Sequence, residues 1–172
     1  MGTHTYLKVV WAVIVAGGLC LSAPAANAGG KAVAGQFTGT YAKQEALPIP
    51  GADGHLLMLS EAQGRNIGKS GSDYMDGAAI INREIADLLQ GNGSHSGYVT
   101  MSMDGNEAVS KWQGQVTTTL NKDGTPNTMF KGSWEAASGT GKYQGIEGSG
   151  TYQGYFTSQT DYVVDWNGHL DY

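Results

Sequence analysis

Residues 156–172 read FTSQTDYVVDWNGHLDY. Large apolar side chains fall on one parity of this stretch and polar side chains fall on the other. The apolar set is Phe156, Tyr162, Val164, Trp166, Leu170 and Tyr172, and the polar set is Thr157, Gln159, Asp161, Asp165, Asn167, His169 and Asp171. A period of two is typical of a β-strand with one buried and one solvated face. The C-terminal end of the chain therefore predicts a half-buried strand.

Earlier parts of the chain repeat this β character between clear turn signals. Runs rich in β-branched and aromatic residues occupy 33–43, 98–103, 112–120 and 128–136, and the short apolar run in 55–61 predicts a buried strand. Turns are predicted at 48–51, 104–105 and 123–126, and a polar loop at 68–73, because Gly, Pro, Asp and Ser gather there.

One segment, Ala78–Leu89, has two interpretations. Ile81, Ile85 and Leu88 recur at helical spacing, so the pattern alone favours a helix. The turn that follows it leads directly into β-like sequence, which favours a strand. The runs add up to seven strands if the segment is helical and eight if it is extended, and eight antiparallel strands can close into a barrel.

Glycine is unusually frequent, with 27 residues in a chain of 172. Two copies of the pattern GxGxYQG begin at Gly139 and Gly148, nine residues apart. A phosphate-binding loop requires a strand before it and a helix after it, and no helical periodicity follows here. We therefore expect these glycines to permit turns, bulges and tight curvature in a small sheet.

The tract Gly132–Gly150, GSWEAASGTGKYQGIEGSG, resembles the strand, glycine-rich aromatic loop and strand of the allene oxide cyclase and dirigent-like barrels. The resemblance implies an all-β, antiparallel eight-stranded β-barrel and therefore a strand at 78–89. The cyclases of that family convert an unstable fatty-acid epoxide in an apolar cavity, and dirigent proteins steer radical coupling. Their catalytic side chains lie outside the matching tract, so the resemblance assigns no catalytic residue to this chain.

The N-terminal segment has the order of a secretory signal. Lys8 precedes the apolar run Val9–Ala23, and Ala26-Asn27-Ala28 offers a cleavage site between small residues. The run is shorter than the roughly 20 residues that span a bilayer, although an uncleaved anchor is the alternative. We expect residues 1–28 to be removed and residues 29–172 to form a single barrel domain, exported to a periplasm or the extracellular space.

Composition excludes several classes of function. The only cysteine, Cys20, lies in the predicted signal, so the mature chain has no disulfide, thiolate metal site or cysteine nucleophile. The formal charge is −5 and no stripe of Lys and Arg exists to replace phosphate counterions, so a nucleic-acid partner is not expected. The spacing of His55, His95 and His169 matches no metal motif, and we expect no metal, no cofactor and no membrane association after cleavage. We interpret His169 as solvated and His95 as a loop residue in 91–97.

A few side chains are candidates for chemistry or binding. Glu84, Asp87 and Glu135 lie in otherwise apolar or small-residue runs, and a carboxylate inside a barrel could act as a general acid or base; Glu84 and Glu135 are the catalytic candidates. The candidates for lining an apolar ligand cavity are Tyr74, Tyr98, Trp112, Trp134 and Trp166. The same aromatic residues could instead fill the interior completely.

These observations predict an exported small barrel that binds a small apolar molecule without catalysis, or serves as a structural module. The alternative is a cyclase or isomerase acting on a hydrophobic substrate inside the barrel. A third class, a partner-interaction protein, would need an exposed apolar patch. The ligand and the oligomeric state are not predicted from the sequence.

Overall fold

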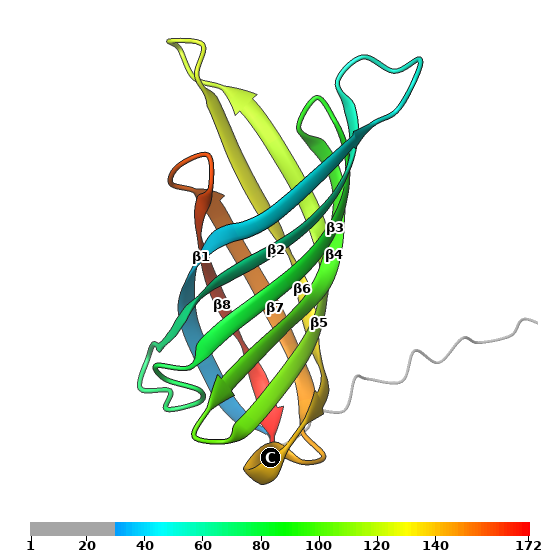
Figure 1. The fold of residues 1–172 in the computed structure, drawn as a ribbon. Coiled ribbons are helices and arrows are strands. Elements are labelled where there is room, and N and C mark those ends of the chain that lie inside the picture. The colour runs from blue at the N-terminus through cyan, green and yellow to red at the C-terminus, as the bar shows by residue number, and fades with distance from the viewer. Residues whose placement is uncertain (1–29) are drawn as a thin grey trace, which may run out of the picture.

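The computed structural model describes residues 30–172, which form a closed barrel of eight antiparallel strands (Figure 1). The strands are β1 (Lys31–Pro48), β2 (His55–Gly68), β3 (Ala79–Leu89), β4 (Asn92–Met103), β5 (Asn106–Leu120), β6 (Pro126–Gly139), β7 (Glu147–Phe156) and β8 (Asp161–Asp171). Each strand pairs with the next along the chain, and β8 pairs with β1. A 3-10 turn, η1 (Gly141–Tyr143), is the one helical element of these residues. The predicted all-β eight-stranded barrel is confirmed, whereas the predicted signal peptide lies outside the described residues.

The ambiguous segment 78–89 is a strand. β3 pairs with β2 along one edge and with β4 along the other, and Ala79 to Leu89 all have partners on both sides. Hydrogen bonding to two neighbours therefore overrides the helical spacing of its apolar residues.

Side chains alternate between the barrel interior and the outer surface, as the sequence predicts for β8. Tyr162, Val164, Trp166 and Leu170 are buried, while His169 is exposed. The predicted strand over 156–172 is divided, however, because residues 157–160 form the turn between β7 and β8.

The strand predicted at 55–61 is confirmed as part of β2, but the prediction that this strand is buried is wrong. Within β2, Leu57 and Leu59 are 38% and 57% exposed, whereas Ser60 and Ala62 are buried. The wall of a barrel has only one interior face, so half of any continuous apolar run must point outward.

Large aromatic residues inside the barrel lie directly opposite glycines on the neighbouring strand. The pairs are Trp166 with Gly35, Tyr162 with Gly39, Trp112 with Gly97, Phe130 with Gly154, Tyr152 with Gly132, and Trp134 with Gly150. A methyl group on any of these glycines would overlap the facing aromatic side chain. The glycine excess therefore has a packing role, because each glycine leaves space for a ring to lie against the barrel wall.

The two copies of the glycine pattern have different structures. The first copy forms η1 and the loop after it, where Gly141 and Gly145 have φ values of 59° and 79°. The second copy is most of β7. The expectation that these glycines shape turns and the sheet is confirmed, and the pattern is not a structural repeat.

Buried residues close one end of the barrel. The β2–β3 loop contributes Tyr74 and Met75, and the β6–β7 connection contributes Tyr143 and Ile146. Met75 and Tyr143 are 0% and 1% exposed. We call this end the floor; the opposite end, which carries the β1–β2, β3–β4, β5–β6 and β7–β8 connections, is the mouth (top of Figure 1).

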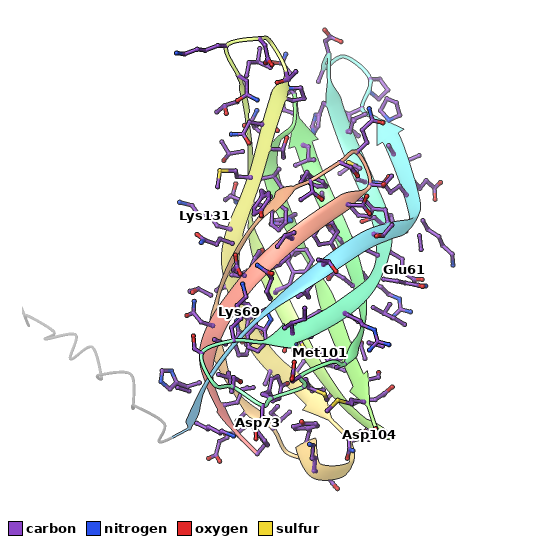
Figure 2. The ribbon with its side chains drawn as sticks, turned by 90° about the vertical axis from the view of Figure 1, so that its left-hand side faces the viewer. Glu61, Lys69, Asp73, Met101, Asp104 and Lys131 are labelled. Carbon is purple, nitrogen blue, oxygen red and sulfur yellow. The ribbon has the colours of Figure 1, made fainter. Side chains whose placement is uncertain are left out.

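The outer surface of the barrel is largely polar. Figure 2 shows Glu61 and Lys131 projecting away from the wall, and Arg83 donates a hydrogen bond to Glu61 across β2 and β3 at 3.0 Å. Among residues 30–172, no helix has the length and apolar character needed to cross a bilayer.

Candidate ligand cavity

The barrel encloses a cavity of about 650 Å³. Aromatic and aliphatic side chains form most of its lining, including Phe37, Trp112, Phe130 and Tyr162. The cavity also reaches exposed residues of the mouth, among them Thr157, Ser158 and Asn127, whereas buried residues close the floor. Small-molecule sites commonly occupy roughly 300–1,000 Å³ and are mainly apolar. The interior is therefore an open pocket with one entrance, rather than a core filled by its own aromatic residues.

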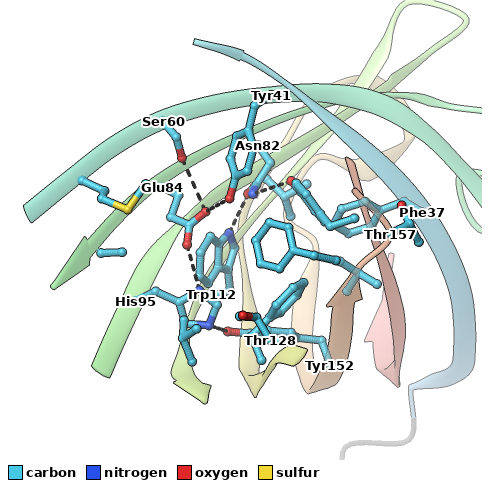
Figure 3. A pocket seen from close by; sticks show the side chains of 18 of the residues that line it. Phe37, Tyr41, Ser60, Asn82, Glu84, His95, Trp112, Thr128, Tyr152 and Thr157 are labelled. Carbon is cyan, nitrogen blue, oxygen red and sulfur yellow. Dashed lines mark hydrogen bonds and ion pairs between the residues drawn. The ribbon is translucent and has the colours of Figure 1, made fainter. Parts of the chain in front are cut away.

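A polar cluster interrupts the apolar lining (Figure 3). The His95 Nδ1 atom lies 2.9 Å from Glu84 Oε1, and His95 Nε2 lies 3.0 Å from the Tyr152 hydroxyl. The other oxygen, Glu84 Oε2, has only long contacts, 3.4 Å to the Tyr41 hydroxyl and 3.5 Å to Ser60 Oγ. The His95 and Glu84 side chains are 4% and 12% exposed. We call Tyr41, Ser60, Glu84, His95 and Tyr152 the Glu84 cluster.

The hydrogen bonds of this cluster connect the carboxylate, the imidazole and the phenol in a row. His95 Nδ1–H donates to Glu84, and Nε2 accepts from or donates to the Tyr152 hydroxyl according to the protons that the ring carries. Burial, and after it the Glu84 charge, raise the pKa of Tyr152, so this phenol keeps its proton. Neither Lys nor Arg is among the residues that line the cavity with Glu84, so His95 is its basic neighbour there.

Beside the Glu84 cluster, a second set of hydrogen bonds fixes the aromatic walls. Trp112 Nε1 donates to Asn82 Oδ1 at 2.9 Å, and Asn82 Nδ2 donates to the Tyr162 hydroxyl at 3.1 Å. Nearer the floor, Trp166 Nε1 donates to Asn66 Oδ1 at 3.0 Å. No buried side-chain polar atom among the described residues lacks a partner. The walls are therefore held in place before any ligand enters.

Four interior tyrosines should resist ionisation. Burial is the largest cause that raises the pKa of Tyr41, Tyr74, Tyr152 and Tyr162 above the usual 10.0. In the unfolded chain they ionise near pH 10, so their contribution to stability is complete below that pH. It is lost as the pH rises above 10, because the unfolded state then binds fewer protons than the folded state.

We therefore expect the free energy of unfolding to fall steeply above about pH 10, and phenolate absorbance from these four residues to appear only with unfolding. A pH titration followed by ultraviolet absorbance and by circular dichroism checks this. Ionisation of these four tyrosines near pH 10 in a folded barrel would contradict it.

The structure brings most of the sequence-predicted residues to the cavity. Glu84, Tyr74, Trp112, Trp134 and Trp166 all line it. Tyr74 and Trp166 are in edge-to-face contact, with ring centroids 6.0 Å apart, near the floor.

Three candidates point outward instead. Glu135 is exposed on the outer face of β6, Tyr98 is 50% exposed on β4, and Asp87 accepts a hydrogen bond from His55 on the surface at 2.6 Å. Each of them alternates with inward-facing neighbours along its strand and therefore points to the outer surface. A role for Glu135 or Tyr98 inside the cavity is excluded in this structure.

Sequence reasoning missed His95. It was expected in a loop, but β4 begins at Asn92 and places the imidazole inside the barrel at 6% exposure. His95 is an even number of residues away from Val99 and Met101, which are buried and face inward. This alternation could have predicted that His95 also faces the interior.

Comparisons with known proteins assign this barrel to no family. No protein-family model matches the chain, and no curated protein matches it. Among residues 30–172, no group of three or more His, Cys, Asp or Glu side chains is placed to hold a metal ion. The fold and the cavity themselves define a class: a closed antiparallel barrel with one entrance and a single acidic cluster inside.

An apolar patch lies on the outer surface near the mouth. Leu47 faces Leu57 across β1 and β2, and Leu59 faces Ile85 across β2 and β3. These four side chains are between 38% and 60% exposed. The patch has the property required of a partner-interaction protein, but the described residues indicate no occupant for it.

Proposed function

We propose that this protein is an exported barrel of the allene oxide cyclase and dirigent-like type that binds a small, mainly apolar molecule without transforming it. The observation that carries the proposal is the open cavity of about 650 Å³. A barrel used only as a structural module gains nothing from this space, because filling it would add buried contacts and stability. The aromatic lining supplies the apolar contact area that such a ligand needs.

Export and the absence of a membrane role belong to the same proposal. Support comes from the order of Lys8, the apolar run and Ala26-Asn27-Ala28, and from the polar outer surface of the barrel. A barrel held by strand pairing and aromatic packing needs no disulfide to persist outside the cytoplasm.

Titration with Nile red, a neutral apolar dye, tests the binding proposal. We expect a saturable rise in dye fluorescence at one dye per chain, with the emission shifted to shorter wavelength as the dye leaves water. Tryptophan-to-dye energy transfer should accompany it, because Trp112 and Trp166 line the cavity. A weak, non-saturable response equal to that of an unrelated protein would contradict the proposal.

A cyclase or isomerase is the second candidate, and the Glu84–His95 pair favours it. A carboxylate and an imidazole 2.9 Å apart in an apolar cavity can move a proton on a bound substrate. An isomerase changes the chromatographic retention of a molecule without changing its mass, whereas a binding protein returns its ligand unchanged. Incubation with a small-molecule extract of the source organism, using wild type and Glu84→Gln, distinguishes the two.

A further inference from the structure

The charge inside the cavity points to the chemical class of its ligand. Glu84 is the only carboxylate among the residues that line it, His95 is the only imidazole, and neither Lys nor Arg is among them. The Glu84 carboxylate therefore has a basic neighbour, His95, on Oε1 and none on Oε2. A charge of this kind is costly in an apolar cavity unless hydrogen bonds or a counterion stabilise it.

The second carboxylate oxygen, Glu84 Oε2, can accept a further hydrogen bond. Glu84 Oε1 has a 2.9 Å contact with His95, whereas the Tyr41 and Ser60 hydroxyls lie 3.4 Å and 3.5 Å from Oε2. A carboxylate oxygen accepts up to two good hydrogen bonds, so Oε2 can accept a short bond from a ligand. Figure 3 shows Glu84 between its hydroxyl neighbours and His95, beside the Trp112 ring.

The surrounding groups favour a cation over other donors. An ammonium group has several N–H donors, and the Tyr41 and Ser60 oxygens lie beside Oε2 as additional acceptors. Aromatic ring faces attract cations, and Trp112 and Tyr41 both line this part of the cavity. An anionic ligand would meet the Glu84 charge with no Lys or Arg of the lining to offset it.

We propose that the cavity binds a small hydrophobic amine, with its ammonium group on Glu84 Oε2 and its apolar body among the aromatic walls. The inference rests on the proposed binding function and names the ligand class for the same site. The overall charge of −5 agrees with this ligand class, because an acidic protein attracts cations.

Three probes that share one rigid hydrocarbon body test the inference: adamantylamine, adamantanol and adamantanecarboxylate. In calorimetric titrations of the wild-type protein we expect the amine to bind at least about tenfold more tightly than the alcohol, and the carboxylate to bind most weakly. This comparison needs no variant. Equal or tighter binding of the alcohol, or of the carboxylate, would overturn the inference.

Two variants test whether Glu84 causes the preference for the amine over the alcohol. Glu84→Gln should remove the advantage of the amine over the alcohol, whereas Glu135→Gln, the same change on the exposed face of β6, should leave it unchanged. An amine preference that persists in Glu84→Gln would overturn the inference. If the wild type binds Nile red but not adamantylamine, the ligand class is wrong while the binding function stands. Failure with both probes contradicts the binding function itself.

Discussion

Replacing Gly150 with alanine is expected to lower the free energy of unfolding by about 3 kcal/mol. Gly150 faces the barrel interior on β7, directly opposite Trp134 on β6. A methyl group there would overlap the Asn167 carbonyl oxygen and lie 2.7 Å from two atoms of the Trp134 ring. Since the carbonyl belongs to the β7–β8 ladder, the overlap is relieved only if paired backbone moves.

Ser149→Ala is the matched control for Gly150→Ala. Ser149 is the adjacent residue and points to solvent, so its unfolding free energy should change by less than about 0.5 kcal/mol. Urea unfolding followed by tryptophan fluorescence measures both variants. Equal stability of Gly150→Ala and Ser149→Ala would mean that the aromatic–glycine pairs do not shape the wall as we describe.

Replacing Ala86 with phenylalanine is expected to weaken Nile red binding at least about tenfold. Ala86 lines the cavity from β3, two residues beyond Glu84 and opposite His95 on β4. The new ring enters open space beside the Glu84 cluster, so the unfolding free energy should change by only about 1 kcal/mol. The variant thus separates occupancy of the cavity from stability of the barrel.

Ile85→Phe provides the control for added bulk on β3. Ile85 is 60% exposed on the outer face, so a larger ring there leaves the cavity unchanged and dye binding intact. Fluorescence titration of both variants, alongside thermal unfolding, makes the comparison. If both variants retain wild-type affinity, the dye binds outside the barrel and the cavity is not the binding site.

The sequence predicted the strands that alternate cleanly and left one segment unresolved for a physical reason. In β8, large apolar and polar side chains fall on opposite faces, so the alternation is visible. In β3, Asn82 and Glu84 point inward while Ile81 and Ile85 point outward. This inversion hides the period of two and creates an accidental helical spacing. The inward polar side chains that hid the strand belong to the polar networks of the cavity.

The candidate site was predicted only in part, because the start of a strand must be known before its inward-facing residues can be identified. Glu84 and Glu135 look alike in sequence, yet one faces the cavity and the other faces solvent. His95 was missed since the glycines around it suggested a loop, whereas Gly97 pairs with Trp112 within the sheet. Contacts such as His95 with Tyr152 join residues 57 positions apart, and local sequence patterns do not reveal them.

Native mass spectrometry of the protein purified gently from its own source tests the central claim most directly. We predict a reproducible complex of one chain with one molecule of a few hundred daltons, which carries a basic nitrogen on an apolar body. The same spectrum reports whether residues 1–28 have been removed. A spectrum that contains only the bare chain after gentle isolation, in repeated preparations, would contradict the claim that this barrel is a ligand-binding protein.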